Sequence, residues 1–181
     1  MTDHRIILFR GMNTGGVRAP VAGQRAMAEA MGLKNPRTLA ASGNLVVESG
    51  KATDALERDI EAEMERRFGL KIAAMVRTPE QWSKLIADNP FAKEAAAHPA
   101  KLLAMVMKDG IRDGGVDAVR AFAAGDERVE AVGGVLYFWH PDGIGQSKMA
   151  GKAQPRLIGV GTGRNWNTVL KLAEMVGLPS R

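Results

Sequence analysis

The sequence predicts an α+β fold made of two halves, residues 1–78 and 79–181, that share one order of strands and helices. Short apolar runs of strand length alternate with apolar stripes at helical spacing, in the order β-α-β-β-α-β in the first half. The second half repeats β-α-β-β-α. At 181 residues, with 45% hydrophobic and 25% charged residues, the chain can bury two small cores.

The first half opens with a strand and a helix. The strand spans His4 to Arg10, and its unbroken apolar stretch is typical of a central strand that is covered on both faces. Pro20 is suited to the first turn of a helix that reaches about Met31, where Gly32 ends it. A loop rich in glycine connects the two elements.

The remaining elements complete a split β-α-β pattern. Two short strands, Arg37 to Ala41 and Leu45 to Glu48, are joined by Ser42-Gly43-Asn44, a hairpin signal. A helix from Asp54 to Gly69 follows, and the alternating segment Lys71 to Arg77 predicts an edge strand. This order is typical of ferredoxin-like folds, in which the first and third strands lie in the middle of an antiparallel sheet.

The second half begins with a capping signal, Thr78-Pro79-Glu80-Gln81, which predicts a helix. Further elements are predicted over residues 102–107 (strand), 115–123 (helix), 129–132 with 135–140 (hairpin), 147 onward (helix) and about 165–176 (helix). No closing strand is recognisable, so we expect a second ferredoxin-like half that lacks it and carries extra helices. Arg164 and Asn165 are expected in the first turn of the last helix.

Three segments place polar side chains beside glycine at the end of an apolar run, which is a common way to bring donors to an anion. They are Arg10-Gly11-Met12-Asn13-Thr14-Gly15-Gly16, Ser42-Gly43-Asn44 and Gly163-Arg164-Asn165-Trp166-Asn167-Thr168. We expect one shared ligand site, to which Lys148 adds a charge. The candidate ligand-binding residues are Arg10, Gly11, Asn13, Gly15, Gly16, Ser42, Asn44, Lys148, Arg164, Asn165 and Thr168.

The charge distribution agrees with an anionic ligand. The net charge is +5, and residues 1–50 hold six Lys and Arg against three acids, while residues 151–181 hold five against one. The excess therefore lies in the sections that carry the three segments, where it would attract anions. With no cysteine and no apolar stretch near the ~20 residues of a membrane span, the sequence predicts a cytoplasmic protein without a membrane partner.

Several chemistries are excluded by missing residues. A Walker phosphate loop needs Lys and Ser or Thr where Val17 and Arg18 stand, and a dinucleotide fingerprint needs glycine at Arg164. The three histidines have no metal-ligand spacing, so no metal and no cofactor are expected. No nucleophile with an adjacent base remains, so the sequence assigns no reaction.

The chain also resembles a known bacterial family, domain of unknown function 1697. The resemblance rests on Arg10-Gly11-Met12-Asn13-Thr14-Gly15-Gly16, Ser42-Gly43-Asn44, Asn89-Pro90-Phe91, Ser147-Lys148 and Arg164-Asn165-Trp166-Asn167-Thr168-Val169, in this order along nearly the whole chain. The closing Arg-Asn-Trp segment is the most specific of these motifs. The resemblance implies two related ferredoxin-like halves and no established activity.

Three hypotheses of function stay open at this point. The favoured one is a site for a small ligand that bears a phosphate or carboxylate. The alternatives are nucleic-acid binding by a basic face and a protein–protein interaction module. Sparse aromatic residues, at 5%, and the absence of dense basic runs weigh against nucleic acid.

Overall fold

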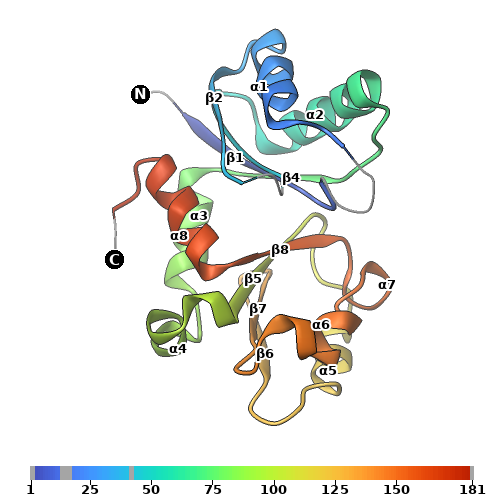
Figure 1. Ribbon diagram of the computed structural model, residues 1–181, viewed down its shortest axis with the longest axis vertical. Helices are drawn as coiled ribbons and strands as arrows, with labels where there is room; N and C mark the ends of the chain where they lie inside the picture. The colour runs from blue at the N-terminus through green and yellow to red at the C-terminus, as the bar shows by residue number, and fades with distance from the viewer. Residues whose placement is uncertain (1–2, 13–17, 41–42, 180–181) are drawn as a thin grey trace. The chain divides into compact units, whose positions relative to one another are not determined.

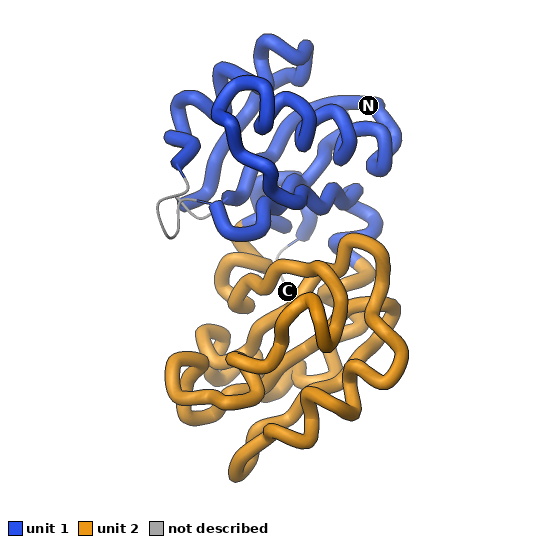
Figure 2. Tube along the Cα trace, turned by 90° about the vertical axis from the view of Figure 1, so that its right-hand side faces the viewer, with its two compact units in different colours: residues 1–83, 172–181 blue, residues 84–171 orange. Residues whose placement is uncertain are grey.

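The computed structural model describes residues 3–12, 18–40 and 43–179. It contains two four-stranded antiparallel sheets, each covered by helices (Figure 1). The chain forms two compact units, residues 1–83 with 172–181, and residues 84–171 (Figure 2). The boundaries between these units fall within two helices, α3 and α8. The sequence predicted a domain boundary after residue 78, and this boundary stays a prediction.

The first unit has the expected element order. Its elements are β1 (His4–Phe9), α1 (Val21–Ala30), β2 (Lys34–Thr38), β3 (Asn44–Glu48), α2 (Thr53–Phe68) and β4 (Ala74–Arg77). The strand order is β2-β3-β1-β4, so the first and third strands lie in the middle, as predicted. Ile7 faces Leu45 on one side and Val76 on the other, in antiparallel register.

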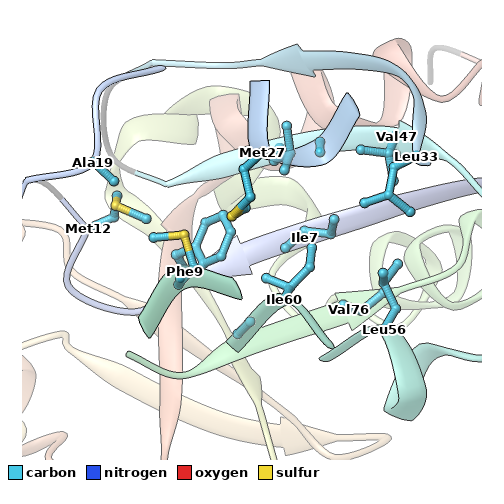
Figure 3. Packing of buried hydrophobic residues seen from close by; sticks show 14 residues of the cluster. Ile7, Phe9, Met12, Ala19, Met27, Leu33, Val47, Leu56, Ile60 and Val76 are labelled. Atoms are coloured by element: carbon cyan, nitrogen blue, oxygen red, sulfur yellow. The ribbon is translucent and has the colours of Figure 1, made fainter. Parts of the chain in front are cut away.

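The core of the first unit lies between its sheet and the two helices α1 and α2 (Figures 1 and 3). Ile7 and Phe9 of β1 meet Met27 of α1 and Ile60 of α2, and none of these side chains is exposed. Every residue from Ile6 to Phe9 is fully buried, which confirms the central, doubly covered strand that its unbroken apolar run predicted. The glycine stop of α2 is also confirmed, because Gly69 ends the helix with a φ of 66°.

The second unit repeats the strand order of the first unit, including its fourth strand. Its elements are β5 (Leu102–Met107), α5 (Gly115–Arg120), β6 (Arg128–Val132), β7 (Val135–Trp139), η2 (Ile144–Gln146), α6 (Lys148–Lys152), α7 (Pro155–Ile158) and β8 (Gly161–Asn165). The strand order β6-β7-β5-β8 matches that of the first sheet position by position. The predicted strand over 102–107 and the hairpin over 129–140 are confirmed. Between the sheets in sequence lie α3 (Pro79–Ala87), α4 (Ala92–Ala97) and η1 (Pro99–Lys101), and α8 (Trp166–Met175) ends the fold.

The expectation that the second half lacks a closing strand is wrong. β8 pairs with β5 along its whole length, from Leu103 opposite Asn165 to Met107 opposite Gly161. The sequence hid this strand because Gly161-Thr162-Gly163 has no apolar alternation and two of its three residues are glycine, which is depleted in strands. Close packing favours glycine there: an added Cβ would lie 2.8 Å from the Val106 carbonyl oxygen at residue 161 and 2.7 Å from Leu103 Cδ2 at residue 163.

The predicted helix start at Thr78 is confirmed. Thr78 and Gln81 form the predicted capping box at α3, in which the Thr78 N–H donates to Gln81 Oε1 at 2.9 Å and the Gln81 N–H to Thr78 Oγ1 at 3.2 Å. None of the described helices is long and apolar enough to span a bilayer.

Candidate functional site

Two of the three predicted segments lie side by side in the first unit. Arg10 and Gly11 directly follow β1, and the Phe9 N–H donates to the Gly43 carbonyl at 2.9 Å. Gly11 and Gly43 both have positive φ, 74° and 86°. The chain therefore turns sharply at each of these glycines where the two segments meet. Asn13, Gly15, Gly16 and Ser42 lie outside the described residues.

Close backbone packing explains why residue 43 is glycine. A Cβ at Gly43 would lie 2.8 Å from the Cβ of Met12 and 3.2 Å from the carbonyl oxygen of Phe9. Met12 is itself buried in the core. The turn after β1 is thus held against the start of β3 by packing that tolerates no side chain, which fixes the place of Arg10 and Gly11 relative to Gly43.

Asn44 is buried, and its side chain holds the backbone. It is 1% exposed, its amide nitrogen donates to the Leu39 carbonyl at 2.9 Å, and the Leu39 N–H donates back to the Asn44 carbonyl at 3.1 Å. These two bonds close the connection between β2 and β3. The structure therefore shows a scaffolding role for Asn44, and its predicted contact with a ligand stays a prediction.

The N-terminus of α1 lies at the same end of the first sheet. α1 begins after its N-cap residue Pro20, whose side chain makes no capping hydrogen bond, and its first turn holds no acidic residue. Ala19 packs in the core beside Met12, which in turn packs against Gly43 (Figure 3). The turn after β1, the start of β3 and the start of α1 are therefore neighbours. The N–H groups at a helix start carry a partial positive charge.

The third predicted segment belongs to the second unit, and its local structure corrects the sequence interpretation. Arg164 and Asn165 lie in β8 rather than in the first turn of α8, because pairing with β5 continues to residue 165. Arg164 is 9% exposed, and its guanidinium donates from Nη1 to Thr162 Oγ1 at 2.7 Å and to the Gly163 carbonyl at 2.9 Å. Burial lowers the pKa of Arg164 to about 10, so it stays charged at neutral pH.

Asn165 and Thr168 act together at the start of α8. The Thr168 N–H donates to Asn165 Oδ1 at 3.1 Å, which makes Asn165 the cap of this helix. Lys148 is the exposed first residue of α6, and the preceding Ser147 caps that helix by accepting from the Ala150 N–H at 3.0 Å. Because these residues lie in the second unit, their membership in one site with Arg10 stays a prediction.

A polar cluster that the sequence did not reveal lies at the start of α6, next to its cap residue Ser147. His140 has no exposed surface, and its Nδ1 lies 3.2 Å from Glu127 Oε2. Its ring stacks on Phe138 with centroids 5.8 Å apart. Ser147 also hydrogen-bonds to Glu127. Thirteen residues separate His140 from Glu127, so no helical or strand spacing could signal this pair, and the described residues contain no cluster fit to hold a metal.

The two ionisable groups of this cluster shift in the same direction. Burial lowers the pKa of His140, although the Glu127 carboxylate opposes this. Burial raises the pKa of Glu127, but hydrogen bonds from Ser147, from the Ala124 N–H and from His140 outweigh it, so the net shift is downward. At neutral pH the cluster therefore holds a neutral imidazole beside a carboxylate.

We expect the protein to lose stability in mild acid because of His140. The unfolded imidazole takes up a proton below about pH 6.5, whereas the buried one resists it, so the free energy of unfolding falls by at most about 1.4 kcal/mol per pH unit. Urea unfolding between neutral and mildly acidic pH measures this slope. In His140→Gln the slope should shrink, and an unchanged slope would assign the effect to other groups.

Two four-stranded antiparallel sheets and their helices define an α+β protein with a doubled strand order. The chain belongs to the family described as protein of unknown function (DUF1697), whose model matches residues 1–137. The conserved bacterial protein SP0830 from Streptococcus pneumoniae has a similar structure, with a TM-score of 0.75 and 17% identity over 97% of this chain and 99% of that chain. At this identity the likeness shows the fold alone. Comparison with curated proteins gives no match.

Proposed function

We propose that the protein binds a small anionic ligand, bearing a phosphate or a carboxylate, at the end of β1 in the first unit. The observation that carries this proposal is the meeting of the Arg10-Gly11 turn with Gly43, through the hydrogen bond from Phe9 and the close approach of Met12. Arg10 supplies a positive charge there. The start of α1, where Pro20 provides no side-chain cap and the first turn holds no acidic residue, adds N–H groups.

We also infer that each unit is a ferredoxin-like split β-α-β domain. The strand orders β2-β3-β1-β4 and β6-β7-β5-β8 support this, because each places the first and third strands of its unit in the middle. In such a sheet the first helix returns antiparallel to the first strand, so its N-terminus lies over the end of that strand. This placement supports the position of the ligand site. With no cysteine in the chain, a reducing cytoplasm suits the protein.

A ligand screen followed by two arginine variants tests the proposal. Nucleotides, sugar phosphates and organic acids are screened by thermal shift, where a ligand at about 100 times its Kd adds about 2.7 kcal/mol to the free energy of unfolding. Hydrogen bonds to a charged ligand contribute about 1.5–3 kcal/mol, so Arg10→Ala should weaken binding of any hit at least about tenfold in calorimetry.

Arg156→Ala is the matched control, since it removes the same charge from an exposed position of α7 in the second unit. Binding should be unchanged in this variant. The proposal is wrong if no compound in the screen stabilises the protein, or if the two variants bind a hit equally. A hit among oligonucleotides alone, with affinity lost equally in both variants, would favour a dispersed basic face for nucleic acid instead.

A further inference from the structure

Gln24 is a polar side chain on the face of α1 that packs into the core. It is 1% exposed and falls at helical spacing with the buried Met27 and Ala28. Its amide nitrogen donates to the carbonyl of Ala19 at 2.7 Å, just before the helix begins. A polar group on the core face of a helix is unusual, because burial removes its hydrogen bonds to water.

The contact with Ala19 fixes which way the amide of Gln24 points. A backbone carbonyl can only accept, so the nitrogen must face it and the oxygen must face away. That oxygen, Oε1, is closed to solvent and has no hydrogen-bond partner in the described part of the chain. A buried acceptor left without a donor is costly to the folded protein, so it calls for an explanation.

This acceptor lies at the end of α1 that belongs to the proposed site. Oε1 is bonded to the same carbon as Nε2, which is hydrogen-bonded to the Ala19 carbonyl. The oxygen therefore lies close to the N-terminus of α1. The first three N–H groups of α1 belong to Val21, Ala22 and Gly23, which precede the first internal helix bond, from Gln24 to Pro20. Donors for an anion and one unpaired acceptor therefore occur together.

We propose that the ligand of this site carries an O–H or N–H donor beside its anionic group, and that Gln24 Oε1 accepts a hydrogen bond from that donor. This inference rests on the proposed function. The N–H groups of the helix start then bind the anionic oxygens, and the donor of the ligand hydrogen-bonds directly to Oε1. A protonated phosphate fits this description, whereas sulfate does not.

An unpaired acceptor should let the site discriminate between anions that carry an O–H or N–H donor and anions that carry none. An acceptor that water does not reach gains a bond only when a ligand supplies the donor, so the gain is not offset by a lost bond to solvent. A ligand without a donor would place its negative oxygens near the negative end of the amide. Selectivity between two otherwise similar oxyanions is therefore the property to measure.

Inorganic phosphate and sulfate are the probes. In weakly acidic buffer phosphate carries two O–H groups and sulfate carries none, so calorimetry should find phosphate bound at least about tenfold more tightly. In Gln24→Met, which keeps the length of the side chain but removes both polar atoms, the two Kd values should come within about twofold. Gln154→Met makes the same change at an exposed site of the second unit and should keep the preference.

The preference of the unmodified protein for phosphate over sulfate can be measured even if the Gln24→Met variant fails to fold. It should persist in weakly alkaline buffer, where phosphate keeps one O–H group and carries the same charge as sulfate. Equal binding of both anions in weak acid, or a preference that survives in Gln24→Met, would overturn the role of Gln24. If neither anion binds in a way that Arg10→Ala weakens, the proposed site itself fails and this inference with it.

Discussion

Replacing Trp166 by alanine should lower the free energy of unfolding by about 3–5 kcal/mol. Trp166 is the first residue of α8, directly after its cap Asn165, and is 6% exposed. Loss of so large a buried side chain leaves a cavity at the start of a helix that also buries Val169 and Leu172. Denaturant unfolding measures the loss.

Asn167→Ala is the control for this change, because residue 167 is exposed in the same helical turn. It should alter stability by no more than about 0.5 kcal/mol. A Trp166→Ala protein as stable as its parent would show that the indole is not part of the core. If that stable variant also failed to bind a ligand found for the parent, Trp166 would be a stacking residue.

Gly161→Ala should be the most damaging change of a single methyl group in the second sheet. The new Cβ would lie 2.8 Å from the carbonyl oxygen of Val106 and 2.6 Å from the sulfur of Met107. Because Val106 contributes backbone, β5 and β8 must separate to accept it, and we expect a loss of about 3 kcal/mol in the free energy of unfolding. Thermal and urea unfolding both report it.

Alanine substitutions at two other glycines serve as comparisons for the loss of stability expected in Gly161→Ala. Gly163→Ala meets only the Leu103 side chain, which can rotate, so its loss should be smaller. Gly151→Ala, in α6, meets nothing within 4 Å and should raise stability by up to about 1 kcal/mol. A Gly161→Ala protein as stable as Gly151→Ala would contradict the close pairing of β5 and β8.

Much of the first sheet could be predicted because its residues carry regular signals. The apolar run from Ile6 to Phe9 indicated a central strand, and Gly69 indicated the end of α2. Strand β2 lies over Lys34–Thr38, a few residues before its predicted place, because Lys34-Asn35-Pro36 lacks the apolar alternation that marks a strand. Local patterns reveal elements whose sequence agrees with their structure.

The candidate site was predicted only in part, because some of its contacts join residues that lie far apart in the sequence. Glycine beside a polar residue marked the turns at Gly11 and Gly43, and the two segments do meet, through Phe9 and Met12. Gln24 was missed because a glutamine among core positions looks like any surface residue of a helix. The pair of Glu127 and His140 was missed because only the fold brings them within 3.2 Å.

By itself, the sequence determined the α+β class, the order of strands and helices in the first unit, the family motifs and the excluded chemistries, since these depend on neighbouring residues. The tertiary structure decided that β8 closes the second sheet, that Arg164 is buried, and that Gln24 and His140 each keep a polar atom without a partner among the described residues. Strand pairing and burial of polar groups depend on residues far apart in the chain, and their energies appear only when the chain has folded.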